Sequence, residues 1–171
     1  QVIDADQVVH ELQEPGERLY QALLSAFGPA ILQEDGRLDR LKLGAMIFGN
    51  PELLEQSSQI QNQIIREELA GRRDLLAGKE DIFFMDLPLL FELGYESWFD
   101  QVWLVDVTEE TQLSRLMTRN ALSQEEAEKR IAAQLSLQEK RNRADVLIDN
   151  NGLLELTQEQ LREALQKLER R

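Results

Sequence analysis

Residues 82–87 read Ile-Phe-Phe-Met-Asp-Leu, and the same pattern returns at 102–107 as Val-Trp-Leu-Val-Asp-Val and at 146–149 as Val-Leu-Ile-Asp. Each stretch is a short, continuous apolar run that contains or ends in Asp. Such runs are typical of strands in a parallel sheet that is buried on both faces. Residues 2–4, Val-Ile-Asp, form a fourth and shorter example. The sequence therefore predicts a parallel sheet with carboxylates at the carboxyl ends of its strands, where open α/β sheets bind ligands.

The residues between these runs show the spacing of helices. Apolar side chains recur at helical intervals in 19–27, 51–69, 113–117 and 153–168. Pro51 suits a first helical turn, Thr108 suits an N-cap, and Ser123 with Glu126 has the signature of a capping box. Strands that alternate with helices predict βαβ units. The stretch 13–77 has helical patterns and no clear strand, which predicts a helical insertion between two strands.

The composition excludes several classes of site. The 171 residues carry a formal net charge of −13, which argues against non-specific binding to nucleic acid or docking on an anionic membrane. A few clustered arginines can still attract a phosphate locally. With no cysteine and one histidine, the chain cannot form disulfides, zinc–thiolate sites, thiol nucleophiles or histidine-rich metal sites. No apolar run approaches the roughly 20 residues that span a bilayer, so a soluble cytoplasmic protein is expected.

Two groups of carboxylates follow predicted strands. Asp4 and Asp6 come directly after the first one, where a carboxylate can accept the proton of an attacking hydroxyl or hold water around Mg²⁺. The simpler alternative is that Asp6 caps the following helix. Asp86 follows a strongly apolar strand, the position at which kinases with a phosphate-binding loop orient Mg²⁺ through water. Pro88 stops that strand, and Glu92 either faces the same cleft or is a surface residue after a capped turn.

Basic residues gather between the last two predicted strands. Arg115 and Arg119 lie four residues apart and so share one helix face. The others follow along the chain: Arg130, Lys140, Arg141 and Arg143. A helical lid that carries arginines would supply the cations that phosphoryl transfer needs. The alternative is a solvated helix pair whose arginines form ion pairs with neighbouring glutamates.

Polar residues also follow the last strand, as Asp149-Asn150-Asn151-Gly152. They suit contact with a nucleotide base and equally suit a plain turn before a helix. His10, on the helix predicted after Asp6, is assigned no role. A Walker A loop, G-x-x-x-x-G-K-[ST], is not found: the only Gly-Lys pair is Gly78-Lys79, Glu80 follows it, and it precedes a strand instead of following one.

These motifs together resemble the dephospho-CoA kinase family. The resemblance covers essentially the whole chain in order and spacing. It is carried by Val2 to Asp6, Phe27-Gly28, Asp35 to Arg40, Pro88 to Glu92, Gln112, Arg115, Arg119, Arg130-Ile131, Gln134, Ala144-Asp145 and Ile148 to Asn150. It implies ATP-dependent phosphorylation of the ribose 3′-hydroxyl of dephospho-CoA, the last step of coenzyme A synthesis, with Mg²⁺. The implied fold is a P-loop kinase core (1–12 and 78–171), a helical CoA-binding insertion (13–77) and a helical lid (about 112–143).

The resemblance also implies roles for single residues. Asp6 would be the catalytic carboxylate near the acceptor hydroxyl, with Asp86 acting on the metal through water. Further residues would act in two groups. The substrate group is Asp4, Arg40, Pro88 and Glu92, and the ATP and lid group is Arg115, Arg119, Arg130, Arg141 and Asn150. Within the lid group, Arg115 and Arg119 would be catalytic together with Asp6.

The chain departs from the family pattern at three places. The family begins with a strand, a Walker A loop and a helix, a unit of very roughly 30 residues that does not precede Gln1 in this sequence. Because the loss of a central strand would leave unpaired edges, we expect that unit to belong to the whole protein, and the 171 residues alone to be inactive. Gln61-Asn62 replaces a His-Pro pair that is usual in the family, and Ser136 replaces a usual Pro.

Two alternatives to the dephospho-CoA kinase function stay open. The chain could be another nucleoside or nucleotide kinase, or an inactive domain that binds CoA-like ligands.

Overall fold

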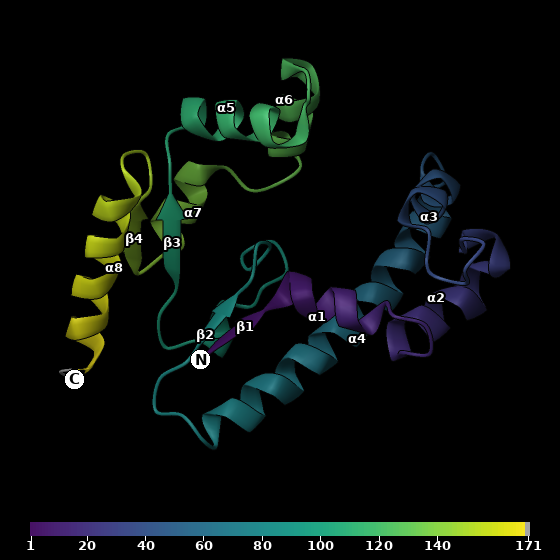
Figure 1. Cartoon of the computed structure of the whole chain (residues 1–171), viewed down its shortest axis with the longest axis horizontal. Coiled ribbons are helices and arrows are strands. Elements are labelled where there is room, and N and C mark those ends of the chain that lie inside the picture. The colour runs from purple at the N-terminus through teal and green to yellow at the C-terminus, as the bar shows by residue number, and fades with distance from the viewer. Residues whose placement is uncertain (170–171) are drawn as a thin grey trace. The chain divides into compact units, whose positions relative to one another are not determined.

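The computed structural model describes residues 1–169, which form two compact units that divide after Pro88. Figure 1 traces both from the N-terminus to the C-terminus. Each unit combines two parallel strands with flanking helices. The predicted insertion, residues 13–77, lies wholly within the first unit and is helical apart from loops and one isolated bridge between Leu32 and Leu38. No helix among the described residues is both long and apolar enough to cross a membrane.

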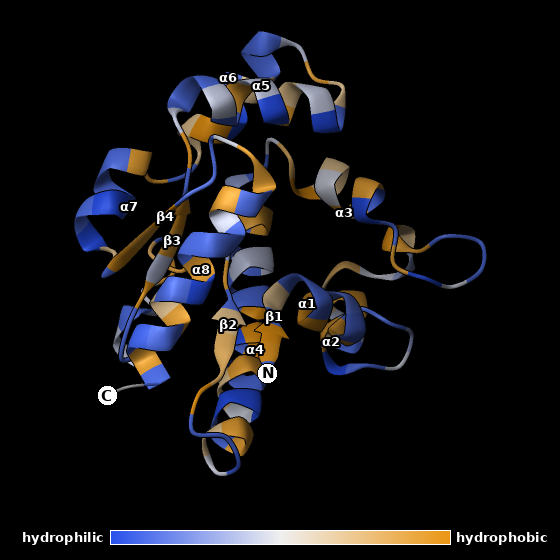
Figure 2. Cartoon of the chain, turned by 60° about the vertical axis from the view of Figure 1, so that its left-hand side comes forward, coloured by the Kyte–Doolittle hydropathy of each residue, from blue (hydrophilic) through white to orange (hydrophobic). Residues whose placement is uncertain are grey.

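The first unit is built on the strands β1 (Val2–Asp4) and β2 (Phe84–Asp86). They pair in parallel, with Ile3 opposite Met85 and Asp4 opposite Asp86. Both strands carry hydrophobic colours in Figure 2. Helix α1 (Ala5–Leu12) begins directly after β1. The two predicted strand-end carboxylates are therefore neighbours at one edge of this small sheet.

The helices of the first unit pack around a common core. They are α1, α2 (Arg18–Phe27), the short 3-10 helix η1 (Pro29–Ile31), α3 (Arg40–Ile47) and α4 (Pro51–Ala77). The buried residues of this core are Val8, Leu12, Leu19, Leu23, Ile31, Leu38, Leu43 and Leu69. Two ion pairs join helices at the surface: Arg72–Glu11 at 2.7 Å between α4 and α1, and Arg18–Glu67 at 2.6 Å between α2 and α4.

The second unit is built on the parallel strands β3 (Trp103–Asp106) and β4 (Val146–Asp149), with Asp106 opposite Asp149. Its helices are η2 (Glu96–Trp98), α5 (Glu109–Asn120), α6 (Gln124–Ala132), α7 (Leu137–Arg143) and α8 (Leu154–Glu169). Thr108 caps α5, and the capping box of Ser123 and Glu126 begins α6, as the sequence predicts. A second capping box, Ser136 with Glu139, begins α7.

The expectation that the strands are buried on both faces is wrong. Ile148 on β4 is 2% exposed beneath α8, but its register partner Val105 on β3 is 55% exposed, and Leu147 is 48% exposed. Val2 on β1 is also largely exposed. The faces of a sheet are covered by the helices that pack on it, and α8 packs chiefly on β4. An apolar run therefore marks a strand here without guaranteeing that both of its faces are covered.

Candidate active site

Three carboxylates gather at the carboxyl ends of β1 and β2. Asp4 is the N-cap of α1, where its Oδ1 accepts a hydrogen bond from the Gln7 backbone N–H at 3.0 Å. Asp6 lies in the first turn of α1, so the capping role that the sequence allowed for Asp6 belongs to Asp4. Asp86 ends β2 opposite Asp4. Within the described residues, the exposed Asp6 carboxylate has no hydrogen bond or ion pair, which leaves it free to accept a proton.

The negative charges of this cluster act on Asp86. Desolvation raises the pKa of Asp86 above its ordinary value, and the charges of Asp4 and Asp6 raise it further. No described cation pairs with these three carboxylates. The site therefore favours a proton or a cation, since either would relieve the repulsion.

The cluster suits a hydrated cation better than a directly coordinated one. Within residues 1–169, no three carboxylate or imidazole side chains converge closely enough to ligate a metal ion directly. Carboxylate oxygens are nevertheless the donors that hard divalent cations prefer, and such cations commonly keep several water ligands. Asp86 and its neighbours thus fit a cation held through water.

Arg40, at the start of α3, contacts His10 on α1. Its Nη2 lies 2.8 Å from His10 Nδ1, and its Nη1 lies 3.5 Å from His10 Nε2. Both residues line a hollow of about 370 Å³ together with residues of the 33–41 segment. Sequence reasoning assigned no role to His10, although its position four residues after Asp6 places both on one face of α1.

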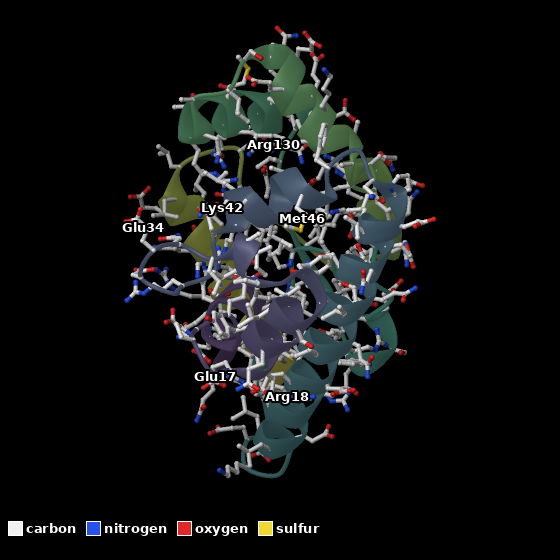
Figure 3. The ribbon with its side chains drawn as sticks, turned by 90° about the vertical axis from the view of Figure 1, so that its right-hand side faces the viewer. Glu17, Arg18, Glu34, Lys42, Met46 and Arg130 are labelled. Carbon is white, nitrogen blue, oxygen red and sulfur yellow. The ribbon has the colours of Figure 1, made fainter. Side chains whose placement is uncertain are left out.

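Arg115 and Arg119 of α5 and Arg130 of α6 are exposed, and Figure 3 shows Arg130 among the side chains of α6. The Nε of Arg119 donates to Asn120 Oδ1 at 3.0 Å. No described glutamate forms an ion pair with any of the three arginines; the pair found in this segment is Lys129–Glu125 at 2.7 Å. Among the described residues, Arg115 and Arg119 therefore form no ion pair with the glutamates that the alternative interpretation invoked. The charge of Arg130 does act on one of them, because the pKa of Glu126 is lowered by hydrogen bonds from Ser123 and, to a smaller extent, by Arg130.

Arg141 instead lies in a protein-internal contact. Its Nε is 2.7 Å from Asp106 Oδ2, and its Nη2 donates to the Val107 carbonyl at 2.8 Å. The hydrogen bond to Asp106 raises the pKa of Arg141. These contacts join α7 to the carboxyl end of β3, so a contact between Arg141 and ATP stays a prediction.

Glu92 is held in a similar way. Its Oε1 accepts from Lys140 Nζ at 2.9 Å and from the Leu135 N–H at 3.0 Å. Burial raises the pKa of Glu92, but the hydrogen bond from Lys140, helped by backbone N–H groups, lowers it below the ordinary value. The ionised side chain thus fixes the segment that follows α6. Pro88 is exposed in the turn after β2, and the predicted substrate contacts of Glu92 and Pro88 remain untested.

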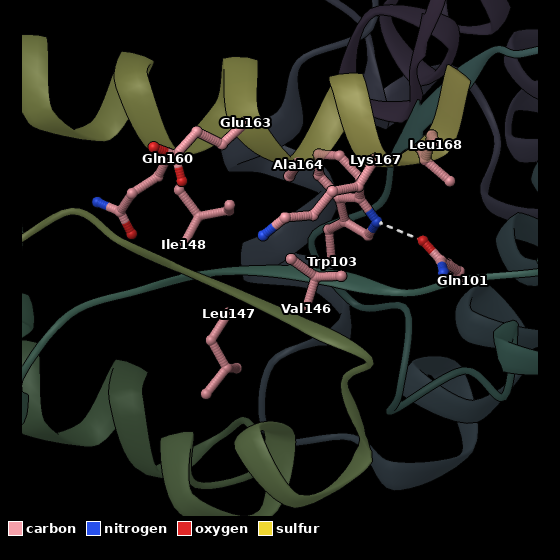
Figure 4. A pocket seen from close by; sticks show the side chains of 10 residues that line it. All are labelled: Gln101, Trp103, Val146, Leu147, Ile148, Gln160, Glu163, Ala164, Lys167 and Leu168. Carbon is pink, nitrogen blue, oxygen red and sulfur yellow. Dashed lines mark hydrogen bonds between the residues drawn. The ribbon is translucent and has the colours of Figure 1, made fainter. Parts of the chain in front are cut away.

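The polar turn after β4 satisfies its own hydrogen bonds. Asn150 Oδ1 accepts from Thr157 Oγ1 at 3.2 Å, and Asn151 Oδ1 accepts from the Thr108 N–H at 2.8 Å. A hollow of about 260 Å³ lies in this unit between α8 and the strands (Figure 4), where Trp103 Nε1 donates to Gln101 Oε1 at 3.2 Å. Trp103 and Val146, which line it, begin their strands. The hollow also reaches Ile148 and Gln160, and Gln160 Oε1 accepts a hydrogen bond from the Asp149 N–H at 2.9 Å.

Comparisons with known proteins agree with this geometry. The family model described as dephospho-CoA kinase matches residues 1–155. A dephospho-CoA kinase of Streptococcus pyogenes serotype M3 is 58% identical over 168 residues, which is 98% of this chain and 85% of the relative. The dephospho-CoA kinase of Streptococcus agalactiae serotype Ia is 56% identical over 167 residues, with 98% and 86% coverage.

Solved structures show the same similarity. A crystal structure of a protein from Thermus thermophilus matches with a TM-score of 0.78 and 32% identity, over 98% of this chain and 84% of that one. A dephospho-CoA kinase from Campylobacter jejuni matches with a TM-score of 0.73 and 26% identity, again over 98% and 84%. The α/β fold with parallel strands is thus that of P-loop kinases, and the chain belongs to the dephospho-CoA kinase family.

Proposed function

We propose that this chain acts in the transfer of the γ-phosphoryl group of ATP to the ribose 3′-hydroxyl of dephospho-CoA, which yields coenzyme A. The observation that carries the proposal is the cluster of Asp4, Asp6 and Asp86 at the adjoining carboxyl ends of β1 and β2. Family membership supplies the substrates. We further propose that the reaction takes place in the cytoplasm, without nucleic-acid or membrane partners.

Asp6 is the residue proposed to accept the proton of the 3′-hydroxyl. A general base must reach the proton that it removes and must not be occupied by other partners. Asp4 is committed to capping α1, whereas Asp6 has no bonding partner among the described residues. The cap on Asp4 also fixes the first turn of α1, and with it the position of Asp6.

Asp86 is proposed to hold Mg²⁺ through water, with Asp4 beside it. When bound, Mg²⁺ neutralises charge on the phosphate oxygens. The charge repulsion that raises the pKa of Asp86 favours a cation at this place. The carboxylates would then orient the water ligands and lower the cost of bringing an anionic nucleotide to an acidic protein.

The arginines of α5 and α6 are proposed to stabilise the transferring phosphoryl group. Arg115, Arg119 and Arg130 are exposed and form no ion pair with a described carboxylate. Cations aimed at developing negative charge are the main source of rate acceleration in phosphoryl transfer. Asn150 and Arg141 are proposed to support the nucleotide site from the polar turn and from α7.

The test is a transfer assay with the protein expressed from its complete reading frame. ATP, Mg²⁺ and dephospho-CoA should give ADP and coenzyme A in equal amounts, and EDTA should stop the reaction. A protein that binds both substrates without transfer would contradict the proposal and favour the binding-domain alternative. Preferred transfer to a nucleoside or nucleotide would favour the other kinase alternative. The 171 residues alone, which contain no Walker A motif, are predicted to give no transfer.

A further inference from the structure

Helices α5 and α6 form a hairpin that is joined to the rest of the second unit through two short stems. The two helices pack chiefly on each other, and Figures 1 and 2 both show them side by side. The entry stem, residues 106–108, leads from β3 into α5, and the exit stem, residues 134–136, leads from α6 into α7. The hairpin carries the three exposed arginines of the proposed phosphoryl site, so the stems set where those arginines lie.

Arg141 holds the entry stem. Its Nε lies 2.7 Å from Asp106 Oδ2, and its Nη2 donates to the Val107 carbonyl at 2.8 Å. The hydrogen bond to Asp106 raises the pKa of Arg141, and the charge of Glu109, the first residue of α5, adds to this effect. One guanidinium group therefore binds the end of β3 and lies close to the start of α5.

Lys140, the residue directly before Arg141, holds the exit stem. Its Nζ lies 2.9 Å from Glu92 Oε1 and donates to Gln134 Oε1 at 3.1 Å. Glu92 Oε1 in turn accepts from the Leu135 backbone N–H at 3.0 Å. Lys140 is buried. Two neighbouring residues of the exit stem are thus connected to one buried ammonium group, and adjacent residues of α7 hold the two stems.

Both carboxylates in these contacts depend on the cations of α7. Glu92 Oε2 and Asp106 Oδ1 are buried and have no hydrogen-bond partner among the described residues. No other described cation forms an ion pair with either carboxylate. A buried carboxylate that loses its cation is strongly destabilised. We therefore expect each stem to keep this position only while its α7 cation is present.

Small movements at the stems become large movements at the arginines. Arg119 lies 11 residues beyond Thr108, the N-cap of α5, which corresponds to about 16 Å along a helix. A tilt of about 5° at the entry stem would move Arg119 by about 1.4 Å over that length. A misplacement of about 1 Å can cost roughly 10²-fold in rate. Accurate placement of the hairpin therefore matters for transfer as well as for stability.

We propose that Lys140 and Arg141 are positioning residues for phosphoryl transfer. By fixing the two stems, they aim the arginines of the α5–α6 hairpin at the transferring group. Glu92 assists as the acceptor that connects Lys140 to Leu135. The inference rests on the proposed function, because the arginines act in that reaction. It gives α7 a role that requires no contact between Arg141 and ATP.

The first test compares kcat in the protein from its complete reading frame with kcat in two variants. Glu92→Gln keeps an oxygen that can accept from Leu135 and Lys140. The double variant Glu92→Leu with Lys140→Met removes both buried charges together, so it should stay folded, but it leaves the Leu135 N–H without its acceptor. We expect kcat to fall at least 10-fold in the double variant and less than about threefold in Glu92→Gln.

A second variant tests the entry stem without removing its charge. Arg141→Lys keeps a cation for Asp106 but lacks the planar fork that reaches Asp106 and the Val107 carbonyl together. Its kcat should fall about 3- to 10-fold. The control Lys129→Gln breaks the pair of Lys129 with Glu125 on the surface of α6, outside both stems, and should keep wild-type kcat.

The position of the hairpin is measured directly with two spin labels. The 171 residues contain no cysteine, so Glu128→Cys on α6 and Glu159→Cys on α8 mark two exposed positions of the second unit. Any cysteine elsewhere in the complete protein is replaced by serine. The distribution of distances between the labels should be broader in the Glu92→Leu with Lys140→Met background than in the wild-type background.

Two results would overturn the inference. One is wild-type kcat in both the double variant and Arg141→Lys, and the other is an unchanged distance distribution. A double variant that raises the KM for dephospho-CoA at unchanged kcat would also overturn it, because Glu92 would then contact the substrate. In each case the proposed function stands if the wild type transfers phosphate. If the wild type gives no transfer but the distribution broadens, the proposed function fails while the stems are confirmed as the supports of the hairpin.

Discussion

Asp86 in the first unit and Asp106 in the second follow nearly identical sequence patterns, yet their surroundings are opposite. Both end a short apolar strand in a two-stranded parallel sheet. Asp86 has two other carboxylates nearby, and its pKa is raised. Asp106 is paired with Arg141 at 2.7 Å. The comparison teaches that a strand-end Asp becomes a candidate for chemistry where the fold leaves it without a cation.

Glu92 and Lys140 extend the contrast. Their side chains are 16% and 9% exposed and lie 2.9 Å apart, so the second unit neutralises its buried charges internally. The first unit instead leaves Asp6 and Arg40 without opposite charges, one in the carboxylate cluster and one at the hollow. Stability and ligand binding thus make opposite demands on charged residues.

The largest expected effect on stability is that of Lys140→Met. Removing this cation leaves Glu92 ionised, largely buried and without a counter-charge, which should cost about 3 kcal/mol. Chemical denaturation at neutral pH would measure the loss. The double variant Lys140→Met with Glu92→Leu should recover much of it. Wild-type stability in the single variant would show that the pair is not a structural element of the second unit.

Arg141→Met should destabilise the protein by less than Lys140→Met does. The Arg141 side chain is 25% exposed, against 9% for Lys140, so water can partly replace it beside Asp106. Thermal unfolding would rank the two variants. A larger loss of stability for Arg141→Met than for Lys140→Met would contradict the expectation that the more buried ion pair contributes more.

Asp86→Asn should leave stability unchanged or raise it at neutral pH. The folded-state pKa of Asp86 lies above the ordinary value, so its ionised form is disfavoured in the native protein. The gain of the variant over wild type should grow as pH rises from the ordinary to the raised pKa, stay constant above it, and vanish at lower pH. Denaturation curves across this pH window measure the difference. A variant less stable than wild type at neutral pH would show that Asp86 is stabilised by a partner.

Glu92 should show the opposite pH dependence. Its folded-state pKa is lowered, so its contribution to stability is present above the ordinary glutamate pKa and is lost as pH falls through the folded value. Glu92→Gln should therefore reduce stability at neutral pH and make little difference at strongly acidic pH. A stability difference between Glu92→Gln and wild type that stays constant across that pH range would show that the effect does not depend on the ionisation of Glu92.

Local sequence signals predicted most of the elements. All four strands lie within the predicted runs, and the caps of Thr108 and Ser123 are confirmed. The helix that begins after Ser136 was missed, although Ser136 and Glu139 carry the same capping-box signature as the pair before α6. The sequence allowed Asp6 as the N-cap of α1, because a sequence alone does not show at which residue the helix begins. In the structure the N-cap is Asp4, which keeps extended geometry with φ −96° and ψ 114°.

Contacts between distant residues could not be predicted. Burial of strand faces depends on which helices pack against the sheet, which an apolar run does not encode. The pairing of His10 with Arg40 spans 30 positions, and that of Asp106 with Arg141 spans 35. Both depend on where a helix begins and which way it faces. The candidate carboxylates were therefore predictable from their strands, whereas their freedom from cations was visible only in the structure.

The central claim is that Asp6 acts as the base in phosphoryl transfer, and its most direct test is the kcat of Asp6→Asn in the protein from its complete reading frame. We predict a loss of roughly 10²- to 10⁴-fold, with unchanged stability and unchanged binding of dephospho-CoA. The control Asp81→Asn alters an exposed Asp before β2, outside the cluster, and should keep wild-type kcat. Near wild-type turnover in Asp6→Asn would contradict the account.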